Sequence, residues 1–313
     1  MRVIVLFPVV LTLAGTVPNY VAAQARQPII DMHQHADTVT RGPTGAPLTR
    51  PCNPSPCQGV PSKAETADDV LKLTLEAMDR NNIVLGFLSS WPLDNVYRWV
   101  EAAPGRFIAS PAVEDPGEID LRALRKDYEA RRLRGMGELA NQYAGIEATD
   151  PRLEPFFALA EEFDVPVLIH HHGTAGPSAQ FRIAMGHPER LEDILVRHPN
   201  LRLAIETSGF PFLEETIALM YRYPQVYGDV SLWKYPREAF HRYLRGLVDA
   251  GLGRRLMFGS DQMVWPDTVI DDEIEAINSA TFLTEEQKRD IFYNNAARFL
   301  RLSEAQIAAH HRR

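Results

Sequence analysis

The sequence has 313 residues, of which 45% are hydrophobic and 24% are charged, with a formal net charge of −8 at pH 7. These values are ordinary for a globular protein of one large or two small domains. The negative charge argues against a nucleic-acid-binding protein, which would need a basic face, and fits an enzyme that acts on a small molecule.

Residues 1–25 have the pattern of a secretory signal peptide. Arg2 precedes an apolar run from Val3 to Ala14, and Ala23-Gln24-Ala25 resembles a cleavage site. The run is too short to cross a bilayer, which needs roughly 20 apolar residues. We therefore expect export to the periplasm or the medium, with no stable membrane insertion after cleavage and a mature chain of residues 26–313.

The stretch 29–36, Ile-Ile-Asp-Met-His-Gln-His-Ala, is predicted to be a buried strand that ends in two histidines. A strand has a period of two residues, so His33 and His35 point to the same face. Paired imidazoles suit zinc, iron or copper. Two polar residues at a strand end are the alternative interpretation of this spacing.

A proline-rich loop is expected at about residues 37–65, because each proline removes a backbone donor and fixes φ. It contains the two cysteines of the chain, Cys52 and Cys57. In an oxidising compartment this spacing favours a local disulfide, whereas in the cytosol the two thiols would stay free.

Short apolar strands then alternate with amphipathic helices along the chain. The expected strands after the first lie at residues 83–89, 106–113, 133–139, 165–170, 201–207, 226–231 and 256–260. The expected helices lie at residues 66–78, 94–102, 121–132, 153–163, 189–197, 213–223, 236–250 and 284–300. This alternation predicts an α/β fold, a (β/α)₈ TIM barrel formed by residues 26–313. An open doubly wound sheet is disfavoured because no Gly-x-Gly-x-x-Gly turn follows the first strand.

Histidines and carboxylates recur where the predicted strands end, which is where barrel active sites lie. They include His33, His35, Glu114, Glu138, His170, His171, His172, Glu206, Asp229 and Asp261. Asp261 could bind a metal through one oxygen and accept a proton through the other, or simply cap the next helix. Period two places His170 and His172 on one face, so the strand pattern does not choose between them.

These motifs resemble the amidohydrolase superfamily, and most closely its amidohydrolase 2 branch, which includes aminocarboxymuconate semialdehyde decarboxylase. The similarity rests on the His-x-His of the first strand, on the histidine that closes the fifth strand and on the stretches 209–211, 227–230, 258–261 and 292–298. It covers nearly the whole mature chain, and it implies a metal-dependent TIM barrel.

The resemblance also implies roles for individual residues. It makes His33, His35, His170 and Asp261 the metal ligands, and it places Glu138 where many members have a fourth-strand ligand. Some members use a carboxylated lysine there to bridge two metals, so the glutamate implies either one metal or a pair bridged by its carboxylate. A hydrogen-bonding role beside the ligands is the alternative for Glu138. Thr207 stands where relatives normally have a sixth-strand histidine, so the usual proton transfer would be lost, moved to His171 or His172, or supplied by Glu206. The candidate catalytic residues are Asp261, Glu138 and His172, and the candidate metal ligands are His33, His35, His170, Asp261 and Glu138.

The function expected from these residues is hydrolysis of an amide, ester or lactone by water activated on one divalent ion. Zn²⁺ is the first choice, with Mn²⁺ or Fe²⁺ as alternatives. Trp233, Tyr235 and Trp265 are candidates to line the substrate pocket, or to pack the long loops.

Two other functions remain open. Non-oxidative decarboxylation of an aromatic or unsaturated acid would be favoured by a cation near the metal, for which Arg182 and Lys234 are candidates. A catalytically weakened barrel that only binds a metal or small ligand is the third hypothesis. A small molecule is the expected partner in each case, and a homo-oligomer is compatible with the sequence.

Overall fold

Eight parallel strands form the centre of the fold in the computed structural model, which describes residues 26–54, 59–173 and 178–313. Their bounds are β1 Ile29–His35, β2 Ile83–Ser90, β3 Phe107–Pro111, β4 Met136–Leu139, β5 Val167–Ile169, β6 Leu203–Ile205, β7 Val226–Asp229 and β8 Leu256–Met257. The predicted strand at each of these positions is confirmed, although several strands end earlier than expected.

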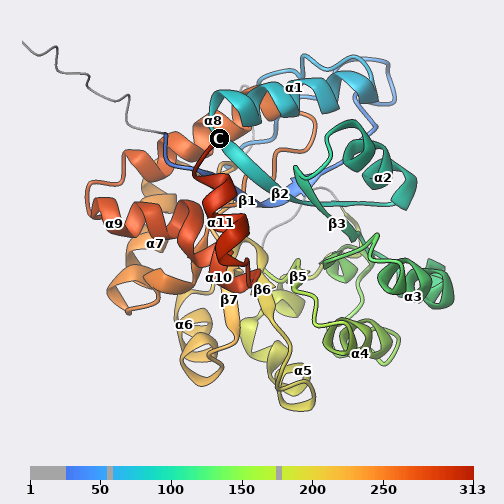
Figure 1. Cartoon of the computed structure of the whole chain (residues 1–313). Coiled ribbons are helices and arrows are strands. Elements are labelled where there is room, and N and C mark those ends of the chain that lie inside the picture. Colours follow the sequence, from blue (N-terminus) through green and yellow to red (C-terminus); the bar gives the residue numbers. More distant parts are fainter. Residues whose placement is uncertain (1–25, 55–58, 174–177) are drawn as a thin grey trace, which may run out of the picture.

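The strands pair in two parallel sheets, in the orders β1-β2-β3 and β4-β5-β6-β7-β8. Backbone hydrogen bonds join the sheets at both seams. Val113 N donates to Glu138 O (2.8 Å) between β3 and β4, and Met32 N donates to Phe258 O (2.8 Å) between β1 and the end of β8. Helices surround the strands (Figure 1), so the predicted (β/α)₈ architecture is confirmed.

The helices follow the strands in alternation. They are α1 Ala67–Arg80, α2 Leu93–Ala102, α3 Leu121–Glu129, α4 Glu154–Glu162, α5 Glu192–Arg197, α6 Leu213–Arg222, α7 Arg237–Asp249, α8 Pro266–Asn278, α9 Glu285–Arg289, α10 Asn295–Phe299 and α11 Glu304–His310. In α1, Thr66 and Asp69 form a capping box that fixes the start of the helix. The residues Val70, Thr74, Ala77 and Met78 are buried on one face, as their spacing predicts.

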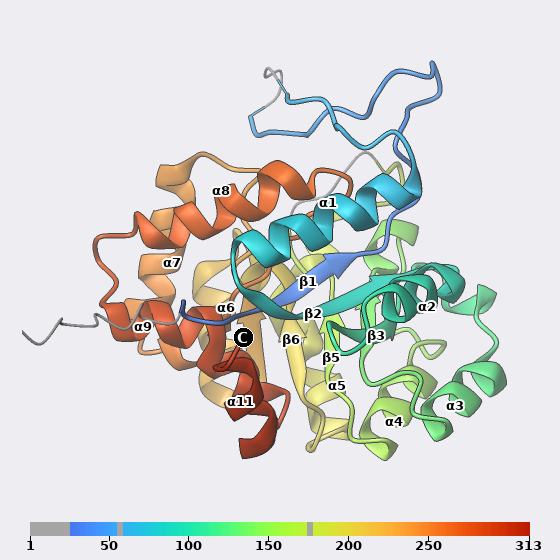
Figure 2. The same ribbon diagram turned by 45° about the horizontal axis from the view of Figure 1, so that its top comes forward.

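Two groups of buried apolar side chains hold these layers together. The larger group lies where the outer helices pack on the strands. The smaller group joins strand residues such as Met32, Leu168 and Met257 to Tyr293 and Phe299 near the C-terminus. Figure 2 shows α11 at the lower edge of the barrel, while the segment between β1 and α1 projects at the top.

The described part of the loop at about 37–65 is irregular, as its prolines predict. It is tied to the region around α8, since Ser62 Oγ donates to Val264 O (2.5 Å) and Trp265 Nε1 donates to Leu48 O (3.1 Å). Cys52 is disulfide-bonded, whereas Cys57 and the expected signal peptide at 1–25 lie outside the described residues. Within the described ranges, no helix has the length and apolar character needed to cross a membrane.

Candidate metal centre

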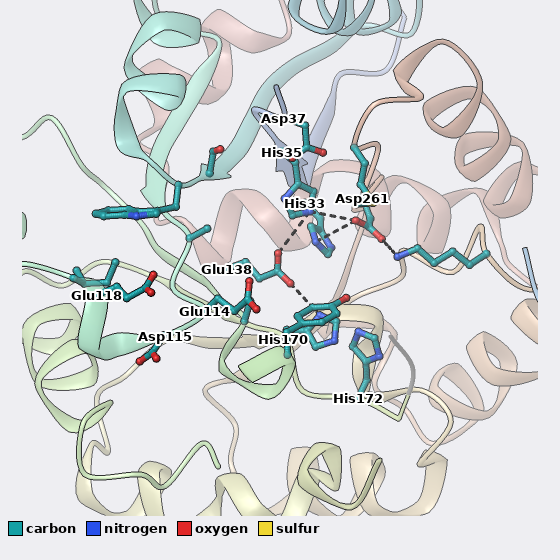
Figure 3. Close-up of a pocket in the computed structure, with 18 residues that line it drawn as sticks. His33, His35, Asp37, Glu114, Asp115, Glu118, Glu138, His170, His172 and Asp261 are labelled. Carbon is teal, nitrogen blue, oxygen red and sulfur yellow. Dashed lines mark hydrogen bonds and ion pairs between the residues drawn. The ribbon is translucent and has the colours of Figure 1, made fainter. Parts of the chain in front are cut away.

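A cavity of about 430 Å³ lies where the carboxyl ends of the strands meet. The residues of the predicted site that line it are His33, His35, Glu138, His170, His172 and Asp261. Figure 3 shows Glu138 between the two β1 histidines and His170, with Asp261 on the far side of the β1 histidines. The structure thus brings together residues from β1, β4, β5 and the β8 loop, which are far apart in the sequence.

His33 and His35 both face this cavity from the end of β1. The Nδ1 atom of His33 lies 3.2 Å from Asp229 Oδ2 and 3.2 Å from Ser231 Oγ. Its Nε2 atom has no hydrogen-bond partner among the described residues. Burial opposes protonation, but the surrounding carboxylates outweigh it and raise the pKa of both histidines to about 9.

Asp261 follows β8 and is fixed from two sides. Its backbone N donates to His33 O (2.8 Å), and Oδ1 lies 3.2 Å from His35 Nε2 and 3.7 Å from His33 Nε2. Its other oxygen, Oδ2, lies 2.6 Å from Lys234 Nζ. Burial acts to raise the pKa of Asp261, but Lys234 and the β1 histidines dominate and hold it well below its usual value. Asp261 is therefore ionised and available as a ligand.

Glu138 lies near the end of β4, and the two oxygens of its carboxylate face different neighbours. Oε1 lies 3.0 Å from His170 Nδ1, and Oε2 lies 3.7 Å from His35 Nε2. Burial raises its pKa, but the bond from His170 and the charges of His35 and His170 lower it to about 2. Glu138 therefore lies close to His35 on one side and to His170 on the other. It could bind a metal ion together with them or accept hydrogen bonds from them.

The side chains of the three consecutive histidines after β5 point in alternating directions, as the two-residue period of a strand predicts. His170 and His172 both line the cavity, with their ring centroids 3.9 Å apart. His171 points elsewhere, with Nε2 2.9 Å from His187 O, and burial lowers its pKa to about 4. Burial and the neighbouring cations hold the pKa of His172 well below 6.5, so its ring is neutral at physiological pH.

The end of β6 carries no titratable group at the expected histidine position. Thr207 is buried outside the cavity lining, where its backbone N donates to Asp229 Oδ1 (2.9 Å). Glu206 lies closer to the site, with Oε2 3.6 Å from His33 Nε2 and 3.9 Å from His170 Nδ1. Burial, followed by repulsion from Glu138 and Asp229, raises the pKa of Glu206 well above its usual value.

Of the two roles expected for the aromatic residues near the ends of β7 and β8, loop packing fits the structure and pocket lining does not. Trp233, Tyr235 and Trp265 do not line the cavity, because both tryptophans are buried in the loop packing, where Trp233 Nε1 donates to Asp261 O (3.1 Å). Tyr143 and the partly exposed Trp91 supply the aromatic surface.

The two candidate cations also differ in position. Lys234 lines the cavity, whereas Arg182 donates to Ala179 O and Phe181 O (both 2.9 Å) away from it. Sequence reasoning left both cations unplaced, because neither lies at a strand end.

Sequence reasoning missed several carboxylates at the site, two of which belong to β1 or lie just beyond it. Asp37 lines the cavity two residues beyond His35, a position that the period of β1 would have indicated. Asp31 lies within β1 and accepts bonds from Ser260 N (2.8 Å) and His33 N (3.1 Å). It therefore holds β1 and the β8 loop in register beneath the histidines.

Comparison with known proteins identifies the family. The amidohydrolase family model matches residues 30–302. The chain belongs to the amidohydrolase family. No curated protein matches its sequence.

Solved amidohydrolase-like structures share the fold at low sequence identity. A probable 2-pyrone-4,6-dicarboxylic acid hydrolase from Acinetobacter baumannii is 15% identical, with a TM-score of 0.59 over 88% of this chain and 99% of that one. A 4-oxalomesaconate hydratase from Rhodopseudomonas palustris is 18% identical, with a TM-score of 0.57 over 90% and 98%. A 2,6-dihydroxybenzoate decarboxylase from Rhizobium is 16% identical, with a TM-score of 0.56 over 88% and 99%.

The donor set of this amidohydrolase fits a divalent metal ion. Ligand atoms of His33, His35 and Glu138 lie within 4.8 Å of one another, and so do those of Glu138, His170 and Glu206. The buried atoms His33 Nε2, Glu206 Oε1 and Glu206 Oε2 have no hydrogen-bond partner among the described residues. Buried polar atoms that converge without partners are what an ion would satisfy.

The cavity of this amidohydrolase is strongly acidic beyond the ligand cluster. Asp37, Glu114, Asp115 and Glu118 also line it, and the last three gather on one side in Figure 3. Lys234 is the sole lysine or arginine among the described lining residues, and its charge is paired with Asp261.

Proposed function

We propose that this amidohydrolase is a metal-dependent hydrolase that cleaves an amide, ester or lactone. The observation that carries the proposal is the convergence of His33, His35, His170, Glu138 and Asp261 on one cavity. We assign these five residues to the metal, for which Zn²⁺ suits the nitrogen-rich set and Mn²⁺ or Fe²⁺ are alternatives.

A bound divalent ion would polarise the carbonyl and lower the pKa of a water molecule toward neutrality. The protein residues around it supply orientation and proton transfer. Asp261 presents Oδ1 toward His33 and His35, while Lys234 holds Oδ2 and fixes the carboxylate rotamer. Asp261 is thereby placed to orient a water molecule and to accept its proton.

His172 is the group we assign to proton exchange with the leaving group. It lines the cavity beside His170, and its imidazole is neutral because burial depresses its pKa. A neutral imidazole can accept a proton and return it. This assignment replaces the sixth-strand histidine of relatives, because Thr207 cannot titrate near neutral pH. Glu138 orients His170 through the 3.0 Å contact with Nδ1.

The charge of the cavity favours hydrolysis of a neutral or cationic substrate over decarboxylation. Asp37, Glu114, Asp115 and Glu118 would repel a carboxylate substrate. Lys234 is a cation that would favour decarboxylation, which keeps that reaction as our second candidate, but Asp261 already neutralises its charge. The third hypothesis is a barrel that only binds a metal or small ligand. It does not explain why Lys234 keeps Asp261 ionised and oriented beside the histidines.

The test uses the purified chain, stripped with a chelator and reloaded with Zn²⁺ or Mn²⁺. It is offered matched esters, lactones and amides that carry neutral, cationic or anionic groups, together with hydroxybenzoic and unsaturated carboxylic acids. Metal-dependent hydrolysis that prefers neutral or cationic substrates, and that Asp261→Asn abolishes, would support the proposal. Release of CO₂ without hydrolysis would favour the decarboxylase. No turnover by a protein that retains metal would favour the binding barrel.

We also propose that the protein acts outside the cytoplasm. The support is the signal-like pattern of residues 1–25 together with the disulfide at Cys52, since disulfides persist in oxidising compartments. Cell fractionation and N-terminal sequencing of the full-length product test this. An uncleaved protein in the cytosolic fraction would contradict it.

A further inference from the structure

Trp233 contacts both members of the ion pair formed by Lys234 and Asp261. Its Nε1 atom donates to Asp261 O (3.1 Å), and Lys234 Nζ lies 5.1 Å from the centroid of its ring. Lys234 Nζ in turn lies 2.6 Å from Asp261 Oδ2. Trp233 is only 8% exposed and lies outside the cavity lining. A substrate in the cavity would not touch this indole, so any effect of Trp233 on the reaction passes through Lys234 and Asp261.

Arg50 holds the indole of Trp233 from the loop that precedes α1. Its guanidinium carbon lies over the indole, 4.8 Å from the ring centroid, and its Nη1 atom lies 2.5 Å from Asp272 Oδ2 on α8. Only 13% of the Arg50 side chain is exposed. A planar guanidinium can stack on an aromatic ring and keep its hydrogen bonds at the same time. Arg50 therefore fixes the orientation of Trp233 relative to α8.

The backbone of the same loop also fixes Lys234. Asn53 N donates to Lys234 O (2.7 Å), and Arg50 N donates to Val60 O (2.8 Å) within the loop. The disulfide-bonded Cys52 lies between Arg50 and Asn53 in the sequence. A disulfide restricts the conformations that are open to the segment it closes. The two contacts with the β7–α7 segment thus come from a short and constrained stretch of chain.

The Lys234–Asp261 pair needs such support because neither residue lies in a helix or strand. Lys234 is in the turn between β7 and α7, and Asp261 is in the loop after β8. A lysine side chain is also flexible, with several rotatable bonds. A ligating carboxylate has to be held within about 0.5 Å of its working position. Contacts from outside the two loops supply the rigidity that the loops lack.

We propose that Trp233 and Arg50 are positioning residues that hold the Lys234–Asp261 pair at the metal centre, and that the disulfide at Cys52 keeps Arg50 against the indole. This inference rests on the proposed function, because Asp261 is assigned there as a metal ligand. It gives the packing of Trp233 between the loops a role in the reaction. Since neither positioning residue touches the substrate, their loss should lower kcat more than it raises KM.

The test replaces the metal by Co²⁺, whose visible absorption depends on the ligands around it and on their geometry. The wild type, Arg50→Gln, Trp233→Phe and Lys234→Met are stripped with a chelator and reloaded with Co²⁺, and their spectra are compared. Cys52→Ser/Cys57→Ser tests the disulfide without leaving a thiol that could bind the ion. Circular dichroism checks that each variant folds.

Two matched controls remove similar contacts that do not reach Lys234 or Asp261. Arg80→Gln breaks an ion pair with the neighbouring aspartate of α8, since Arg80 Nη2 lies 2.8 Å from Asp271 Oδ2. Trp265→Phe removes a second buried indole donor of the loop packing, which bonds to Leu48 O (3.1 Å). Both controls should give the wild-type spectrum.

Arg50→Gln, Trp233→Phe and the cysteine-free variant should shift the Co²⁺ spectrum in the same direction as Lys234→Met. A shift in Lys234→Met alone, or in none of the variants, would overturn the positioning role and leave the metal centre intact. Equal shifts in the two controls would also overturn it, because they would show a general loosening of the loops. A wild-type spectrum in the cysteine-free variant would overturn the part assigned to the disulfide. No bound Co²⁺ in the wild type would overturn the metal centre and this inference with it.

Kinetics with a substrate found by the hydrolysis screen give a second measurement. Arg50→Gln should lower kcat about 10-fold in the wild-type background, with little change in KM. The same substitution should have a clearly smaller effect on kcat in Lys234→Met, because the residue through which it acts is then gone. Equal effects in both backgrounds would contradict the assignment. Unaltered Co²⁺ binding without turnover of any substrate would count against the hydrolase proposal only, since the spectra decide the positioning role.

Discussion

Lys234 Nζ lies 2.6 Å from Asp261 Oδ2 at the wall of the cavity, and this pair sets the charge state of the β8 carboxylate. Replacing Lys234 by methionine keeps the length of the side chain and removes the charge. The pKa of Asp261 should rise, so the acidic limb of the activity profile should move to higher pH. We expect activity to fall roughly 10- to 100-fold, as for other groups that orient a ligand.

A measurement of metal affinity distinguishes the electrostatic effect of Lys234 on Asp261 from a merely structural role. Removing a cation beside Asp261 removes a competitor of the metal, so Lys234→Met should bind the ion as tightly as the wild type or more tightly. A chelator competition measures this. Arg182→Met is the matched control, because that side chain bonds to Ala179 O and Phe181 O outside the cavity. Weaker metal binding in Lys234→Met would contradict the prediction.

Asp229 is expected to fix the tautomer of His33. Its Oδ2 lies 3.2 Å from His33 Nδ1, while Oδ1 accepts bonds from Thr207 N and Ser231 N. A proton on Nδ1 leaves Nε2 free for a metal ion. Asp229→Asn replaces an acceptor by a competing donor, so metal affinity should fall about 10- to 100-fold.

Ser231→Ala is the control for this effect. It removes a hydroxyl 3.2 Å from the same ring nitrogen but leaves the Asp229 carboxylate in place. Its loss of affinity should be clearly smaller, measured by the same competition. Equal losses in the two variants would contradict the prediction that the carboxylate is the group that fixes the tautomer of His33.

The strand ends were predictable from sequence because apolar runs define them. His33, His35, His170, His172 and Asp261 each follow such a run, and a parallel barrel brings these ends together. The expected bounds were too long at several strands. Strand β5, for example, ends at Ile169, before His170.

Other parts of the site could not be predicted, because they depend on contacts between segments that are far apart in the sequence. Lys234 reaches Asp261 from the loop after β7, and Glu206 reaches the histidines where the chain turns through left-handed residues, with φ of 55° at Thr207. Helix α8 was missed although its sequence held a signal. Val269, Ile270, Ala276 and Ile277 have helical spacing, but the acidic Glu273 lies within the same buried stripe.

Metal affinity should depend steeply on pH because the β1 histidines are protonated in the metal-free protein. Their pKa is about 9, so below that pH each must lose a proton before it can bind the ion. Glu138 and Asp261 are already ionised and release none. The affinity for the ion should rise up to about 100-fold per pH unit between pH 6 and 8 and level off above pH 9.

Calorimetry in two buffers with different ionisation enthalpies counts the protons released. Release that approaches two protons per bound ion at pH 7 is the expected result. His171→Gln is a suitable control, since His171 is buried away from the cavity and neutral at this pH. Binding that releases no protons would contradict the protonated state of His33 and His35.

Glu273 should limit the stability of the barrel at neutral pH. It is fully buried on α8, where Oε1 accepts a bond from Leu232 N (2.9 Å) and Oε2 has no partner among the described residues. Burial raises its pKa well above 4.5, so the folded state keeps a proton that the unfolded state loses as pH rises. The free energy of unfolding contributed by this group therefore falls above pH 4.5.

Glu273→Gln removes this dependence and retains an oxygen for Leu232 N. The variant should match the wild type near pH 5 and be more stable at pH 8, by about 1 to 3 kcal/mol, the usual cost of an unsatisfied buried polar group. Urea unfolding at both pH values measures the difference. The exposed Glu101→Gln serves as control and should show no such change. A stability difference that does not grow with pH would contradict this prediction. It would mean that Glu273 is ionised in the folded state and paired with Arg237 or Arg50.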